Sequence, residues 1–139
     1  MSKFPKQERL NSKKRFGELI SAGNSLYIYP FRLLWITSPA DSFHLQVAFS
    51  VPKRKYKRAV DRNRIKRKMR EAFRLEKESL KEEMKSNQTE LCMLLIYIGK
   101  KEEEWQEFQK SMQEMLIRLK KSIDRSEEHT SELQSLLII

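Results

Sequence analysis

The sequence has little of what catalytic, secreted or membrane proteins need. Its single cysteine, Cys92, excludes an internal disulfide and a cysteine-based zinc site. Three glycines in 139 residues are too few for a phosphate-binding glycine loop. The longest apolar run, residues 91–98, is far shorter than the roughly 20 residues of a membrane span. The basic N-terminus lacks the apolar block of a secretory signal, so we expect a cytoplasmic protein.

The sequence also lacks the clustered carboxylates that hold two catalytic metal ions in many nucleases. Asp41 lies in a predicted turn and Asp61 in a cationic run, whereas the glutamates lie on helix faces at spacings typical of ion pairs. His44 is the only histidine before residue 125, which gives little support to a paired nucleophile and histidine. We therefore expect no catalytic residue, no metal site and no cofactor bound by the protein alone.

Positive charge is concentrated in one segment, residues 53–74. This segment holds twelve Lys and Arg residues against two acids, a net charge of +10 that equals the net charge of the whole chain. Such a run repels itself unless it meets an anion, and a polyphosphate backbone supplies evenly spaced negative charge. Apolar residues recur within it at helical spacing, at Ile65, Met69 and Phe73. This stripe favours a docked helix over about residues 60–85 rather than a disordered basic tail.

Periodicity elsewhere predicts further helices and four strands. Apolar positions three and four residues apart indicate helices over residues 10–22 and 102–121. Strand patterns cover residues 25–37, split at Pro30, and residues 43–51 and 91–98. This α-β-β-β-α-β-α order predicts an α/β (α+β) two-layer sandwich, in which helices cover one face of a mostly antiparallel, four-stranded sheet.

We interpret residues 1–124 as a single RNA-binding domain and residues 125–139 as a non-native tail. The segment RSEEHTSELQS at residues 125–135 resembles the translation of a sequencing-library adapter, and an apolar stub follows it. Segments of this kind are left out of fold reasoning. The alternative is a natural C-terminal extension without a fixed structure.

Residues 59–67, AVDRNRIKR, followed by REAF at residues 70–73, resemble the RNR signature of the bacterial ribonuclease P protein subunit. The resemblance covers about residues 9–121, and outside the signature it includes Arg9-Leu10, Phe16, Gly23 and Ser50-Val51. It implies a left-handed β-α-β crossover through the RNR helix. It also implies that the protein assists a catalytic RNA subunit, which holds the reactive Mg²⁺ ions, in the endonucleolytic removal of the 5′ leader from precursor tRNA.

This role needs one surface for structured RNA and another for a single-stranded leader. Basic side chains and one amide in the predicted helix and the preceding connection are expected to bind the RNA subunit: Arg62, Asn63, Arg64, Lys66, Arg67, Arg70, Lys53, Arg54 and Lys57. The leader is expected to meet aromatic rings and polar strand positions: Phe16, Phe31, Gln46 and Ser50. The expected partners are ribonuclease P RNA and the precursor tRNA leader, without a membrane or a small-molecule cofactor.

The sequence departs from the family's pattern at two places. The family often has a glycine in the connection before the RNR helix, whereas residues 55–58 contain none, which leaves the backbone path of this connection open. An aromatic residue common in the second long strand is Leu34 here, and the neighbouring Trp35 points to the other side of the strand. We expect the stacking role of that position to be moved or lost.

Three other hypotheses share the cationic helix. A ribosomal-type structural protein would clamp folded RNA without preferring a leader. A basic-helix DNA-binding protein would carry a dimerising heptad seam, but Leu75, Leu80 and Met84 do not follow heptad spacing. An autonomous nuclease would need the carboxylate ligands that the sequence lacks.

Overall fold

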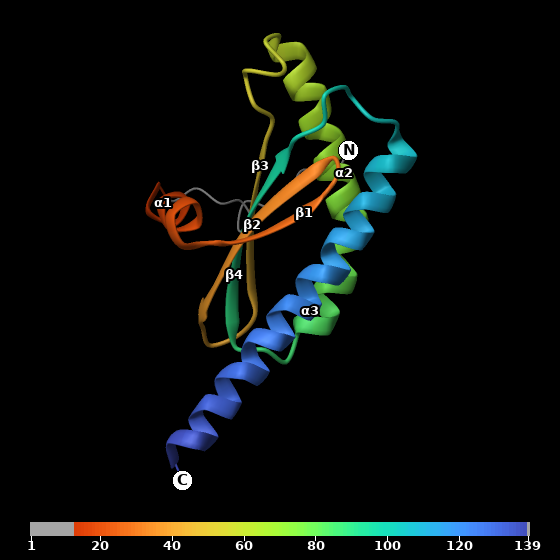
Figure 1. The fold of residues 1–139 in the computed structure, drawn as a ribbon. Helices are drawn as coiled ribbons and strands as arrows, with labels where there is room; N and C mark the ends of the chain where they lie inside the picture. The colour runs from red at the N-terminus through yellow and green to blue at the C-terminus, as the bar shows by residue number, and fades with distance from the viewer. Residues whose placement is uncertain (1–12, 139) are drawn as a thin grey trace.

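The fold is a four-stranded sheet with helices on both sides (Figure 1). This computed structural model describes the backbone of residues 13–138 and the side chains of residues 16–21 and 23–124. In chain order the elements are α1 (Lys13–Ala22), β1 (Asn24–Ile28), β2 (Phe31–Pro39), β3 (His44–Ser50), α2 (Ala59–Met84), β4 (Thr89–Tyr97) and α3 (Trp105–Ile138). The predicted α-β-β-β-α-β-α order is confirmed.

The element boundaries differ from the predicted ones mainly at the two ends of the chain. The sequence predicts that the last helix ends near Lys121, but α3 continues to Ile138 across a stretch without glycine or proline. The interpretation of residues 125–139 as a non-native tail stays a prediction. The predicted first helix begins at Leu10, and its part before Lys13 lies outside the described residues. Among the residues that the structure describes, no helix combines the length and apolar character of a membrane span.

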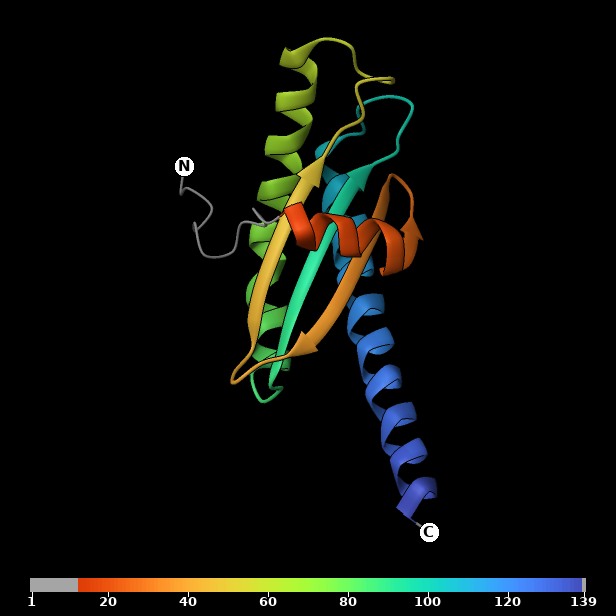
Figure 2. The same ribbon diagram turned by 90° about the vertical axis from the view of Figure 1, so that its left-hand side faces the viewer.

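The sheet has the order β1-β2-β4-β3. The pairs β1–β2 and β2–β4 are antiparallel, and β3–β4 is parallel. In Figure 2, seen from the side of α1, β3 and β4 both point upward, β4 lies to the right of β3, and α2 lies behind the sheet. The β3-α2-β4 unit is therefore a left-handed crossover, as the resemblance implies, whereas about 98% of such connections are right-handed.

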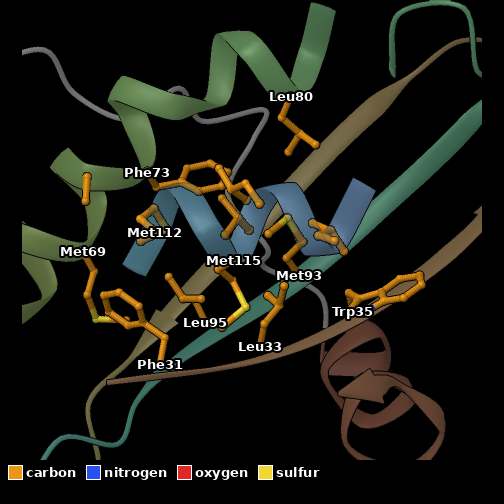
Figure 3. Packing of buried hydrophobic residues seen from close by; sticks show 14 of the residues in the cluster. Phe31, Leu33, Trp35, Met69, Phe73, Leu80, Met93, Leu95, Met112 and Met115 are labelled. Atoms are coloured by element: carbon orange, nitrogen blue, oxygen red, sulfur yellow. The ribbon is translucent and has the colours of Figure 1, made fainter. Parts of the chain in front are cut away.

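The main core lies between the sheet and the two long helices. Figure 3 shows how Phe31 and other side chains of the strands meet Met69 and Phe73 of α2 and the methionines of α3. The ring of Phe31 meets Tyr97 and Phe108 edge to face, at centroid distances of 6.0 and 5.5 Å. The apolar stripe predicted for the cationic segment is thus the buried side of α2.

The helix α1 covers the opposite face of the sheet, so the prediction that the helices share one face is wrong. Leu19 of α1 packs with Leu34 of β2 and with Cys92 and Leu94 of β4 in a separate buried cluster. The physical reason is that β4 carries apolar side chains on both of its faces, and one layer of helices can bury only one of them. The Cys92 thiol is buried in this cluster and forms no disulfide.

Replacing Phe31 by alanine should lower the free energy of unfolding by about 3–5 kcal/mol, the usual cost of emptying a buried phenylalanine site. Phe31 is fully buried. Urea unfolding followed by circular dichroism measures the loss. Ile20→Ala is the control, because Ile20 is 71% exposed and surface truncations change stability by less than about 0.5 kcal/mol. Equal unfolding curves for the two variants would contradict the position of Phe31 in the core.

Candidate nucleic-acid interface

The connection from β3 to α2 is held in place by hydrogen bonds from its own side chains and from Arg62 of α2. Arg62 donates through Nη1 to the carbonyl oxygens of Tyr56 and Lys57, each at 2.8 Å. The side chains of Lys55 and Tyr56 donate to carbonyl oxygens of the loop after β4, at 2.7 and 2.8 Å. No described residue has a positive φ angle. Residues 55–58 therefore follow a path that needs no glycine.

Arg64 and Lys68 of α2 share one carboxylate from the loop before α3. The Arg64 Nε lies 2.8 Å from Glu102 Oε1, and the Lys68 Nζ lies 2.7 Å from Glu102 Oε2. Arg64 also pairs with Asp61 one turn earlier, at 2.9 Å. Burial raises the pKa of Glu102, but hydrogen bonds from Lys68 and Arg64 outweigh it and hold this pKa below its ordinary value. Glu102 thus neutralises charge on the side of α2 that faces α3.

Six basic side chains and one amide form a surface that no described acid neutralises. Within the part of the chain whose side chains are described, none of the seven makes a side-chain hydrogen bond or an ion pair. We name this surface the cation face, and its members are Lys53, Arg54, Lys57, Asn63, Lys66, Arg67 and Arg70. Its members on α2 recur at three and four residues, so they share one side of the helix.

The structure thus divides the predicted RNA-binding residues into two groups. Seven of the nine form the cation face. The other two, Arg62 and Arg64, are the arginines of the RNR motif and are already held by groups of the protein. The Arg64 side chain remains 50% exposed, so a phosphate can still approach it. Arg62 is partly buried, and its two carbonyl partners give it a role in shaping the connection.

Three of the four predicted leader contacts lie on the side of the sheet that carries α1, which we name the α1 face. Phe16 of α1 is partly buried and packs against the cluster around Leu19. Along β3, Leu45 and Val47 belong to the main core, so the alternating positions Gln46 and Ser50 point to the α1 face. All three predicted contacts are partly exposed, which leaves them accessible from this side.

The fourth predicted leader contact, Phe31, is wrong. Its side chain points into the main core together with Leu33 and Trp35, on the side of β2 that faces α2 and α3. The ring is fully buried between Tyr97 and Phe108. A nucleotide base cannot stack on a ring that has no exposed surface. Aromatic character alone did not distinguish this core position from a surface position.

The two residues at the family's aromatic position are also covered. Leu34 faces α1 and is 8% exposed, while Trp35 faces the main core and is 5% exposed, as strand alternation predicts. The α1 face does carry an exposed aromatic ring that the sequence patterns did not indicate, on Tyr27 of β1. The guanidinium carbon of Arg32 lies 5.2 Å from the centroid of this ring. The feature that identifies Tyr27 is its pairing with Arg32, and this pairing is known only once the strand register is known.

A sheet with one partly open face, beside a cation face that has no acidic partner among the described residues, indicates a nucleic-acid-binding protein. The family model described as Ribonuclease P matches residues 4–120. The chain belongs to the ribonuclease P protein family. The ribonuclease P protein component of Porphyromonas gingivalis is 28% identical over 122 residues, which cover 87% of this chain and 89% of that protein. The component of Chlorobaculum tepidum is 41% identical over 81 residues, which cover 55% of this chain and 53% of that protein.

Solved structures of ribonuclease P proteins share the fold. The protein from Staphylococcus aureus superposes with a TM-score of 0.59 at 25% identity, over 84% of this chain and 97% of that chain. The protein from Thermotoga maritima gives a TM-score of 0.63 at 22% identity, over 80% of this chain and 96% of that chain. The second likeness supports the architecture alone, because the sequences have diverged so far.

Replacing Glu102 by glutamine should lower the free energy of unfolding near neutral pH. The difference in this free energy between the variant and the wild type should become smaller in acid. The pKa of Glu102 is lower in the folded protein. Its stabilisation is therefore complete above the unfolded pKa of about 4.3 and is lost as the pH falls through the lower folded value. Urea unfolding at several pH values from about pH 7 to pH 3 measures the free energy of unfolding of the wild type and of Glu102→Gln.

Glu104→Gln is the matched control for this experiment. Glu104 lies two residues away, is exposed, and makes no side-chain ion pair within the described residues. Its replacement should leave the pH dependence of stability close to that of the wild type. A stability difference for Glu102→Gln that stays constant across this pH range would rule out the ion pairs as its cause.

Proposed function

We propose that this protein is the protein component of ribonuclease P and assists a catalytic RNA in removing the 5′ leader from precursor tRNA. The observation that carries the proposal is the cation face, whose six basic side chains have no acidic partner among the described residues. Membership of the ribonuclease P protein family supports the same role. In this proposal the protein is the RNA-binding part of an endoribonuclease, and it supplies no catalytic group.

The RNA subunit binds the cation face. Lys66, Arg67 and Arg70 project from one side of α2, and Lys53, Arg54 and Lys57 extend the same charge along the connection from β3. Each cation that meets a phosphate releases condensed counterions, so the affinity should fall steeply as salt is added. Asn63 differs from its neighbours because its amide can both donate and accept a hydrogen bond. It is suited to an RNA hydroxyl or base edge in addition to phosphates.

The single-stranded leader lies on the α1 face. Phe16 offers an aromatic ring, and bases of any sequence can stack on such a ring. The Gln46 amide and the Ser50 hydroxyl can each donate and accept hydrogen bonds, as contacts with 2′-hydroxyl groups and base edges require. A surface that depends on stacking suits leaders of varied sequence.

The Mg²⁺ ions of the reaction are held by the RNA subunit in this proposal. Mg²⁺ binds to clustered oxygen ligands, whereas the cation face repels it, and within the described residues no group of three or more His, Cys, Asp or Glu side chains is placed to hold a metal ion. The chain contributes its own fixed positive charge. This charge reduces the repulsion between the RNA subunit and the precursor tRNA, so that the complex forms with less Mg²⁺ in solution.

Cleavage of a precursor tRNA by a bacterial ribonuclease P RNA at low Mg²⁺, with and without the protein, tests the proposed function. We expect rapid cleavage only when both components are present and no cleavage by the protein alone. A protein that binds RNA tightly and in a salt-sensitive manner, but stimulates no such RNA, would instead be a ribosomal-type structural protein. That outcome would contradict the proposed function.

Replacing Arg67 and Arg70 together by alanine should weaken binding to the RNA subunit and reduce stimulation at low Mg²⁺. Both side chains are exposed and unpaired within the described residues. Loss of two phosphate contacts should lower the slope of log affinity against log salt by about two. Titration of the RNA subunit at several salt concentrations measures the slope. The control, Lys110→Ala with Lys121→Ala on α3, removes two exposed cations outside the cation face and should leave the slope unchanged.

Replacing Phe16 by alanine should weaken binding of leader-bearing precursor tRNA by about 1–3 kcal/mol, the range for loss of one stacked base. Binding of mature tRNA, which has no leader, should not change. Phe16→Leu is the matched variant, because leucine keeps apolar contact with the cluster around Leu19 but lacks a ring. Equal affinities of the wild type and Phe16→Leu for precursor tRNA would show that Phe16 acts only through packing.

A further inference from the structure

A row of four side chains crosses the α1 face from one edge of the sheet to the other. The strand register pairs Ser50 with Ile96, Ile96 with Arg32, and Arg32 with Tyr27. Directly paired residues of neighbouring strands point to the same side of a sheet. These four side chains therefore form one line, which we name the cross-sheet row. With strands about 4.8 Å apart, the row is about 14 Å long.

The row ends at Tyr27, whose surroundings suit the stacking of a base. Its side chain is 58% exposed, although it lies on a regular strand. The guanidinium carbon of Arg32 lies 5.2 Å from the ring centroid, a cation–π contact that restrains the ring. A ring that is already held in position loses less conformational entropy when a base stacks on it. Tyr27 thus combines free aromatic surface with a fixed orientation.

Arg32 supplies positive charge to the row without an acidic partner. Within the described residues it makes no ion pair and no side-chain hydrogen bond, and its Nε is buried without an acceptor. A buried donor without an acceptor is costly, and the contact with the Tyr27 ring leaves the hydrogen-bonding capacity of Arg32 unused. The planar guanidinium is well matched to a phosphate group. Arg32 can therefore receive a phosphate beside a base that stacks on Tyr27.

The other end of the row adjoins the cation face. Ser50 is the last residue of β3, and Lys53 follows three residues later. The next row along the sheet is closed to a ligand, because Leu34 and Leu94 are buried beneath Leu19 of α1. Figure 2 shows α1 lying across this side of the sheet. The cross-sheet row is thus a continuous path of one hydroxyl, one apolar, one basic and one aromatic side chain that starts beside the cations.

We propose that Tyr27 and Arg32 form a second binding site for single-stranded RNA, at the end of the cross-sheet row. The inference rests on the proposed function and extends it, because it assigns a path for the part of the leader beyond Phe16, Gln46 and Ser50. A base of the leader stacks on the exposed surface of Tyr27, and the adjacent phosphate binds Arg32. Ile96 gives apolar contact between the two polar ends of the row.

The affinity of the reconstituted RNA–protein complex for precursor tRNAs with successively longer leaders tests this inference. For the wild type, affinity should rise with leader length until the leader reaches Tyr27. Tyr27→Ala should lose at least about fivefold in affinity for long leaders and nothing for the shortest. Tyr27→Phe should retain the wild-type affinity, because stacking needs only the ring. Arg32→Gln should weaken the binding of precursor tRNAs with long leaders and lower the slope of their log affinity against log salt by about one.

Tyr29→Ala is the matched control, since Tyr29 is a neighbouring tyrosine with a similar exposure of 56% and bonds to Glu103 outside the row. It should bind long leaders like the wild type. If Tyr27→Ala and the wild type bind every leader with equal affinity, the inference is overturned. If the wild-type complex still cleaves precursor tRNA in that case, the proposed function stands. A loss that is the same for short and long leaders indicates a structural role and also overturns the inference. Absence of stimulation by the wild-type protein overturns both.

Discussion

The burial of one side of α2 against the sheet is the interaction on which the rest of the structure depends. The segment that carries the whole net charge of the chain is also the segment that places Ile65, Met69 and Phe73 in the core. Like charges at three and four residues oppose a helix, and most helical stability in proteins comes from packing of the apolar side. Hydrophobic contact therefore holds repelling cations together and directs them away from the core.

Along the chain, α2 connects the parallel neighbouring strands β3 and β4, and this connection brings the two proposed RNA surfaces together. Because α2 follows β3 directly, the connection with its cations begins at the end of the strand that carries Gln46 and Ser50. The central strand β4 is apolar on both sides, so α1 must cover part of the α1 face. That cover buries Leu34 and leaves the positions nearer the cations accessible.

The sequence predicted the elements, their order and the buried side of α2, because these follow from local periodicity. The alternation over residues 43–51 also identified the side on which Gln46 and Ser50 lie. It could not assign Phe31, since an aromatic residue in a strand fits a core as well as a binding surface until the packing of both faces is known. The Glu102 ion pairs and the pairing of Tyr27 with Arg32 join residues through the tertiary structure, and no local pattern indicates them.

The internal bonds of the RNR arginines determine where the remaining charge points. Arg62 fixes the connection through two carbonyl oxygens, and this places the cations of the connection beside those of α2. Glu102 neutralises the side of α2 that faces α3, through Arg64 and Lys68. The positive field is therefore concentrated on the cation face, on the other side of α2. Through the connection, the cation face extends to the end of β3. In the proposed function this field orients the RNA as well as binding it, because the surface proposed for the leader begins where the cations end.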